Sequence, residues 1–134
     1  MSNPISSYLG LQADALPLRE QRLKLIASNL ANADTPGYRA RDLDFDAALQ
    51  AAAQARKAGR PGAAAEPRPG HLPLPAADSP FAVARTAAQP SLDGNSVDPD
   101  AERAAYGRAA LEYRASLSFL ESKVRTLMTA ITGQ

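Results

Sequence analysis

The sequence predicts a mainly α-helical protein in which two long terminal helices pack as an elongated, coiled-coil-like pair. Apolar residues recur at helical spacing in both terminal segments. Of the eleven prolines, only Pro4, Pro17 and Pro99 lie outside residues 34–97, and aromatic residues make up only 5% of the chain, too few for a thick compact core. We therefore expect an N-terminal helix over residues 1–33 and a C-terminal helix over 98–134. The Pro/Ala-rich middle, 34–97, is predicted to be irregular and partly disordered, with short extended pieces.

The N-terminal segment carries two leucine stripes. One contains Leu9, Leu16, Leu23 and Leu30, and the other contains Leu11, Leu18 and Leu25. At ~100° per residue the stripes lie roughly 200° apart, on nearly opposite faces of a helix. A helix that is apolar on two sides must be buried on two sides. Since the chain has only one other long helix, we expect the second stripe to face neighbouring subunits. Pro17 is expected to kink or split this helix.

Residues 27–38 predict how the first helix ends. Pro36 disfavours helical backbone at Thr35, so the helix should end by about Asp34. The stretch Thr35-Pro36-Gly37-Tyr38 predicts a type II turn with Gly37 at positive φ. Asn29 and Asn32 are able to hydrogen-bond the freed carbonyls or a neighbouring backbone. A helix stop and a turn explain each residue singly, but not the abundance of amide side chains.

The middle segment begins with an alternating pattern. Leu43 and Phe45 alternate with Asp42, Asp44 and Asp46, which is typical of extended chain. An acidic edge that is solvated or paired with arginine is the preferred interpretation, because the glycine and glutamate of an EF-hand loop are missing; a metal site is the weaker alternative. Residues 56–85 contain six prolines and five basic against two acidic residues. This composition predicts mobility in isolation, either as a spacer or as a segment that orders against a neighbour.

The C-terminal segment has the clearest helical pattern. The dipeptide Asp93-Gly94 predicts a turn that closes a short hairpin or bends the chain into the helix. Asp98 is a suitable N-cap and Pro99 a suitable first residue, while Asp100 and Glu102 suit the positive end of the helix dipole. A heptad seam follows at alternating spacings of four and three: Tyr106, Ala110, Tyr113, Leu117, Leu120, Val124, Leu127 and Ile131, widened by Leu111, Phe119 and Met128. Gly133 is a plausible stop. A helix of this length would run ~50 Å and overshoot a globule of ~14 Å radius of gyration, so we expect an elongated molecule.

Composition excludes several classes of function. A net charge of +1 argues against a general nucleic-acid binder. The absence of cysteine excludes disulfides, thiol nucleophiles and Cys-rich zinc sites. His71 has no evident catalytic partner, and no nucleophile-elbow, P-loop or zinc-protease motif occurs, so we expect neither an enzyme nor a cofactor. No run of ~20 apolar residues predicts a membrane span, and the first ten residues lack the pattern of a cleaved secretory signal.

The stretch Ser28-Asn29-Leu30-Ala31-Asn32-Ala33-Asp34-Thr35-Pro36-Gly37-Tyr38 resembles the N-terminal signature of flagellar rod and hook proteins. The segments that resemble the proximal rod proteins in particular are Arg41–Phe45, Gly70-His71-Leu72, Ser91–Asp98, Glu102-Arg103 and Ala110–Tyr113. The resemblance implies a structural subunit of the flagellar basal-body rod that assembles helically through its terminal helices and transmits torque.

The same resemblance implies a location and partners. The subunit would lie in the periplasmic rod, exported by the flagellar type III apparatus without a cleaved signal peptide. Its partners would be copies of itself, other rod proteins, the rod–membrane-ring adaptor and the membrane ring. No nucleic acid and no direct membrane insertion are implied.

Two sets of candidate residues follow. The signature set expected to serve assembly is Ser28, Asn29, Asn32, Asp34, Thr35, Pro36, Gly37, Tyr38, Asp93, Gly94 and Asn95. The set expected to serve helix packing is Leu16, Leu18, Leu23, Leu25, Leu30, Tyr113, Leu117, Leu120, Val124, Leu127 and Ile131. The alternative function is a soluble helical adaptor or export chaperone that binds a partner helix, which would share the heptad seam but need no amide-rich turn. A peripheral membrane helix would need more basic residues on the helices.

Overall fold

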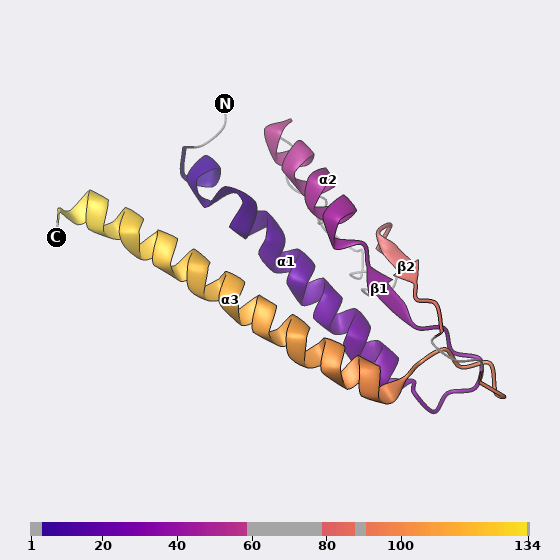
Figure 1. Ribbon diagram of the computed structural model, residues 1–134. Coiled ribbons are helices and arrows are strands. Elements are labelled where there is room, and N and C mark those ends of the chain that lie inside the picture. The colour runs from indigo at the N-terminus through magenta and orange to yellow at the C-terminus, as the bar shows by residue number, and fades with distance from the viewer. Residues whose placement is uncertain (1–3, 59–78, 88–90, 134) are drawn as a thin grey trace, which may run out of the picture.

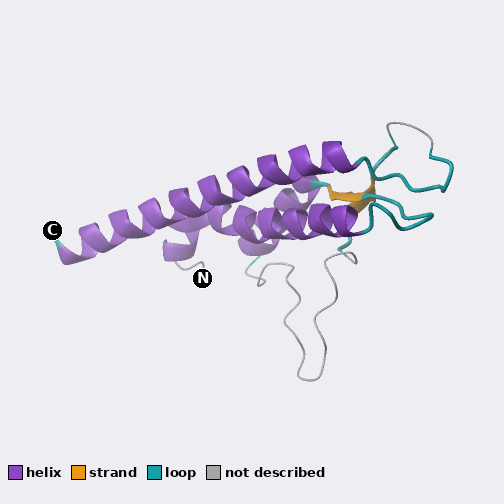
Figure 2. Ribbon diagram, turned by 90° about the horizontal axis from the view of Figure 1, so that it is seen from below, coloured by secondary structure: helices purple, strands orange, loops and turns teal. Residues whose placement is uncertain are grey.

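The computed structural model describes residues 4–58, 79–87 and 91–133. Within these ranges the elements are α1 (Pro4–Ala31), β1 (Arg41–Leu43), α2 (Phe45–Lys57), β2 (Ala82–Ala84) and α3 (Pro99–Thr132). The two long helices, α1 and α3, pack side by side, and α2 lies on the other side of α1 (Figure 1). The sheet and the loops gather at one end of this elongated molecule, and the last turn of α3 lies at the other (Figure 2). The predicted fold class, a mainly helical protein with paired terminal helices and short extended pieces, is confirmed.

The ends of α3 follow the sequence closely. The Asp98 side chain accepts hydrogen bonds from the backbone N–H groups of Asp100 (3.0 Å) and Ala101 (3.2 Å). Pro99 occupies the first turn, and Gly133 ends the helix in the left-handed conformation, φ 69°. The predicted N-cap and stop are confirmed, since each satisfies backbone groups that the helix leaves without partners.

The face of α3 that contacts α1 lies about one residue earlier than the predicted heptad seam. Ala109 and Ser116 are only 5% and 7% exposed, whereas Tyr106 and Val124 are each 43% exposed and Ile131 is 74% exposed. Small side chains allow two helices to approach closely, so the larger apolar residues of the predicted seam flank the contact. The other packing candidates on this helix are half-buried: Tyr113, Leu117, Leu120 and Leu127.

A glycine breaks α1, and the proline does not. Gly10 has φ 43° and ψ −127°, outside the helical region, while Pro17 lies within the helix. The expectation that Pro17 splits the helix is wrong, and a kink at Pro17 stays a prediction. Pro17 is exposed, so water can hydrogen-bond the carbonyl that its missing N–H leaves free.

Helix α2 forms where the sequence suggested irregular chain. Asp44 caps it, accepting a hydrogen bond from Ala47 N at 3.1 Å. Asp46 lies in its first turn and Arg56 and Lys57 in its last, as the helix dipole favours. The alternation at residues 42–46 therefore spans the junction of β1 and α2 instead of one continuous strand. The Ala-rich run after it has high helix propensity, which decided the outcome.

Helix α2 packs on the side of α1 that carries the second leucine stripe. Arg56 Nε lies 2.8 Å from the Asp14 carboxylate, and Leu18 and Leu25 follow Asp14 on the same side of α1 at helical spacing. Leu25 is 2% exposed. On the opposite side, Arg19 pairs with Glu112 of α3. The expectation that this stripe needs a neighbouring subunit is corrected for Leu25, which the chain itself buries, whereas Leu11 of the same stripe is 52% exposed.

Strands β1 and β2 form an antiparallel pair in the register Arg41↔Ala84, Asp42↔Val83, Leu43↔Ala82. Asp93-Gly94 lies outside this pair and bends the chain toward α3.

None of the described helices combines the length and apolarity needed to cross a membrane. The Gly70-His71-Leu72 segment and the prolines from 61 to 75 lie outside the described residues.

Candidate functional site

The most elaborate polar contacts lie where α1 ends and α3 begins. We call this region the polar junction, comprising Asn29, Tyr38, Asp42, Arg85, Asn95, Glu102 and the backbone that they bond. It joins residues from α1, β1, α3 and the two loops on either side of the sheet, which meet at this end of the molecule (Figure 1). Asn29 and Glu102 are almost fully buried, at 0% and 2% exposed.

Asn29 pairs with the backbone of β1. Its Nδ2 donates to Arg41 O at 2.7 Å, and its Oδ1 accepts from Arg41 N at 3.0 Å. The amide thus bonds both backbone groups of one strand residue, on the edge of β1 away from β2. Nδ2 also donates to Glu102 Oε2 at 3.2 Å, and the Tyr38 hydroxyl reaches Oδ1 at 3.4 Å. One side chain therefore links α1, the sheet and α3.

Acidic and basic side chains alternate in a series of ion pairs that runs from Glu102 through Arg85 and Asp42. The Glu102 carboxylate accepts from Arg85, and Arg85 also donates to Asp42 at 2.8 Å. Asp42 in turn accepts two hydrogen bonds from Arg22 of α1, at 2.9 and 3.1 Å. Burial acts to raise the pKa of Asp42, but the hydrogen bonds from Arg22 and Arg85 outweigh it and lower that pKa. The bond to Asp42 raises the pKa of Arg22.

Asn95 closes the C-terminal end of α1 from the other loop. Its Nδ2 lies 3.0, 2.8 and 2.9 Å from the carbonyl oxygens of Asn32, Ala33 and Thr35. These carbonyls lie in the turn that follows α1, and this amide supplies two hydrogens to the three oxygens. Its Oδ1 accepts from Val97 N at 2.8 Å, so the amide is satisfied on both sides.

The two loops are joined by their backbones as well. Gly37 N donates to Asp93 O at 2.9 Å, and Ser96 N donates to Tyr38 O at 3.0 Å. Gly37 has φ 71°, and Tyr38 N bonds Thr35 O at 3.2 Å, which confirms the predicted turn with glycine at positive φ. Ser96 Oγ also accepts from Ala40 N at 2.7 Å. The loops are thereby held as one unit.

The remaining signature residues lie at or beside this junction. Asn32 Nδ2 donates to Ser28 O at 2.9 Å, and the Thr35 hydroxyl donates to Asn32 Oδ1 at 3.2 Å. The sequence-based expectation that Asn29 and Asn32 bond freed carbonyls or nearby backbone is confirmed. Asp34 and Pro36 are exposed.

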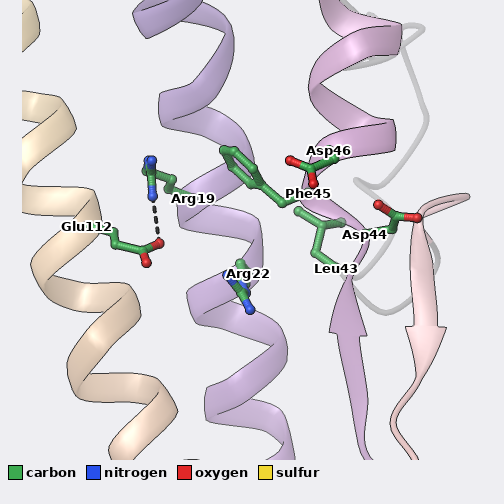
Figure 3. Close-up of a pocket in the computed structure, with 7 residues that line it drawn as sticks. All are labelled: Arg19, Arg22, Leu43, Asp44, Phe45, Asp46 and Glu112. Carbon is green, nitrogen blue, oxygen red and sulfur yellow. Dashed lines mark hydrogen bonds and ion pairs between the residues drawn. The ribbon is translucent and has the colours of Figure 1, made fainter.

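An open depression lies beside the junction, between the start of α2 and the two long helices (Figure 3). Arg19 extends from α1, with its Nη1 2.6 Å from Glu112 Oε2 and its guanidinium carbon 5.0 Å from the centre of the Phe45 ring. This arrangement ties α3 and α2 to opposite sides of α1. Among the described residues, no group of three or more His, Cys, Asp or Glu is placed to hold a metal ion.

The outer face of α3 presents large apolar side chains. We define this outer face as Tyr106, Leu111, Phe119, Val124, Met128 and Ile131, which are 43–74% exposed. At ~100° per residue, Leu111 and Phe119 point roughly 140° to either side of Tyr106, while Val124, Met128 and Ile131 lie near the direction of Tyr106. Apolar groups therefore leave the helix in several directions.

Sequence reasoning missed the roles of Glu102, Arg85 and Arg22. Glu102 was assigned to the helix dipole, yet it turns inward and contacts Asn29. The sequence did not indicate this, because the predicted seam left out Ala109, the buried residue that stands seven positions after Glu102 on the same face. Arg85 carried no signal either, since its partner Asp42 is 43 residues away in the sequence.

The two long helices are joined by a fixed polar junction, and apolar side chains on α3 remain exposed. This arrangement is typical of a structural subunit that assembles with other chains. A family model described as "Flagella basal body rod protein" matches residues 11–39, which span most of α1 and the turn after it. The flagellar basal body rod protein FlgB of Escherichia coli K12 is 40% identical over 134 residues, covering 98% of this chain and 97% of the relative.

Two other relatives agree. FlgB of Salmonella typhimurium LT2 is 38% identical with 99% of each chain covered, and FlgB of Cereibacter sphaeroides is 42% identical with 94% of each covered. The chain belongs to the FlgB family of flagellar basal body rod proteins. It is a structural component of the flagellar basal body.

Proposed function

We propose that this chain builds the rod through the outer face of α3, while the polar junction holds α1 and α3 in a fixed register. The observation that carries the proposal is the set of exposed apolar side chains along a helix whose inner face is already occupied by α1. A soluble chain gains nothing from exposing them, and adjoining subunits would bury them.

The directions of these side chains favour more than one neighbour. Tyr106, Val124 and Met128 share one side of α3, whereas Leu111 and Phe119 project to other sides. A single partner helix covers one stripe, so several adjacent subunits are needed to bury all of them. Val124 and Ile131, predicted as packing residues, are proposed to act between subunits, whereas Leu16, Leu23 and Leu30 lie on the side of α1 that faces α3.

Membership of the rod family supports the wider proposal. The subunit would be exported by the flagellar type III apparatus and would contact copies of itself, other rod proteins, the rod–membrane-ring adaptor and the membrane ring. Its mechanism would be stiff helix packing that transmits torque, without catalysis. The signature residues of the polar junction would serve this by fixing the shape of each subunit.

A matched pair of surface variants tests the proposal. Val124→Asp places a charge on the outer face, and Gln50→Asp places one on an exposed polar position of α2, away from α3. In a strain that lacks the native gene, we expect Val124→Asp to lower the amount of chain in purified basal bodies by about tenfold or more, as for a disrupted interface hot spot. Gln50→Asp should assemble normally, and both purified chains should keep wild-type helicity.

The results that contradict the proposal are specific. Normal basal-body incorporation and swimming with Val124→Asp would show that the outer face is not an assembly surface. A chain that stays in the cytosol bound to another protein, and is missing from basal bodies, would favour the adaptor or chaperone function instead.

A further inference from the structure

The break in α1 at Gly10 interrupts the helix but not its apolar pattern. One series in α1 alternates at spacings of three and four, and its members Gln12 and Arg19 contact α3. The series is Leu9, Gln12, Leu16, Arg19, Leu23, Ile26 and Leu30. In the sequence, Ile5 stands four residues before Leu9 and continues the series. A heptad pattern that runs through a break in unchanged phase fits a helix that is also able to form without the break.

Contacts along the pair fix a constant antiparallel register. Asn29 contacts Glu102, Arg19 contacts Glu112, and the Tyr8 carbonyl contacts Lys123. The two residue numbers add to 131 in each pair. A continuous α1 in this register would place Ile5 opposite Thr126, next to Leu127 and one turn beyond Lys123.

Lys123 stabilises the bent form. Its Nζ donates to Tyr8 O at 3.0 Å and lies 3.5 Å from Gln12 Oε1, so it contacts α1 on both sides of Gly10. It also lies 5.3 Å from the centre of the Tyr8 ring. In a continuous helix the Tyr8 carbonyl would accept from Gln12 N–H. At the break the lysine ammonium donates to this carbonyl.

We propose that α1 is a two-state element with Gly10 as its hinge. In the bent state Lys123 caps the Tyr8 carbonyl. In the straight state residues 4–9 extend the seam and Ile5 packs on Leu127. The inference concerns the chain by itself and does not depend on assembly through the outer face.

The backbone at Gly10 makes the hinge testable. A Cβ added there would meet no heavy atom within 4 Å, so space does not oppose a side chain. The conformation does, since φ 43° with ψ −127° is unfavourable for L-residues. Gly10→Ala should therefore destabilise the bent state and leave the straight state intact. Gly107→Ala is the matched control, a glycine inside α3 whose added Cβ likewise has free space.

Disulfide trapping measures the straight state directly. The chain has no native cysteine, so Ile5→Cys with Leu127→Cys gives one pair, which forms a disulfide only when the two Cα atoms come within about 7 Å. Under mild oxidation of the purified full chain, we expect Gly10→Ala to speed intramolecular disulfide formation by about tenfold. Lys123→Met, which keeps the aliphatic length but removes the donor, should speed it several-fold, and Gly107→Ala should not change it.

Three results would overturn the hinge. One is the absence of an intramolecular disulfide in every variant. Another is an equal rate for Gly10→Ala and Gly107→Ala. The third is formation of disulfide-linked dimers only, which would show that Leu127 is covered by a second copy.

Discussion

The two ends of the α1–α3 pair differ in their chemistry: buried polar contacts hold one end, and the other end exposes apolar side chains. At the polar junction, Asn29, Asn95 and Glu102 are buried and bonded to groups from distant parts of the chain. At the distal end, Met128 and Ile131 are 56% and 74% exposed. Polar contacts of fixed geometry specify one arrangement, whereas apolar contacts accept partners of many shapes. The junction therefore sets the form of the subunit, and the distal end is left for contacts that the single chain does not make.

The largest expected effect is at the centre of the junction. Glu102→Ala removes the carboxylate that Arg85 and Asn29 share and leaves both without this partner in a buried setting. We expect the free energy of unfolding to fall by about 3 kcal/mol, as for a buried ion pair that loses one member. Urea denaturation followed by circular dichroism measures it.

The control for Glu102→Ala is Arg103→Ala, one residue along. Arg103 and Asp100 form an exposed pair, with side chains 68% and 92% exposed. Such pairs contribute less than about 0.5 kcal/mol. Equal losses in the two variants would contradict a special role for the junction.

Asn95→Ala should have the next largest effect. It removes the side-chain donor to the carbonyls of Asn32, Ala33 and Thr35, and only those of Asn32 and Thr35 keep a backbone donor in the turn. We expect a loss of about 2 kcal/mol in the free energy of unfolding. Asn95→Asp keeps the shape but presents oxygen to those carbonyls, so it should destabilise more than alanine does. If the aspartate variant proved the more stable of the two, the capping role would be wrong.

Two glycines allow a direct comparison of the ends. Gly37 at the junction and Gly133 at the distal end have φ of 71° and 69°, and a Cβ at either would meet no heavy atom within 4 Å. The local penalty for alanine is therefore about 1 kcal/mol at both. Thermal melts should show that loss for Gly37→Ala. Gly133→Ala should change global stability by less than about 0.5 kcal/mol, because the end of α3 opens separately from the rest. Similar losses would mean that the two ends unfold together.

The smallest expected effect is a pH dependence at the edge of the junction. Because Asp42 has a folded pKa below its ordinary 3.8, its ionised form stabilises the fold. That stabilisation is complete above about pH 5 and is lost as the pH falls through the lowered pKa. The difference in unfolding free energy between wild type and Asp42→Asn should narrow as the pH drops from about 6 to about 2. A difference that stays constant would contradict the paired state of Asp42, and Asp100→Asn serves as the exposed comparison.

Local rules predicted the parts of this fold that depend on neighbouring residues. The Asp98 cap, the Gly37 turn and the length of α3 all follow from residues within one or two turns of each other. The contacts missed by sequence reasoning depend on residues far apart, such as Arg85 with Asp42 and Asn95 with Ala33. The predicted seam of α3 lies about one residue from the observed contact with α1, because periodicity identifies an apolar stripe but not the helix that packs on it. The stripe flanks α1, and small residues such as Ala109 take the buried positions.

A density map of the assembled basal body that resolves this chain would show directly which contacts lie within a subunit and which lie between subunits. We predict that Asn29, Asn95 and Glu102 keep their contacts within the chain, while Val124 and Met128 pack against adjacent subunits. A map in which the junction is rearranged by neighbours, or in which Val124 and Met128 face solvent, would contradict it.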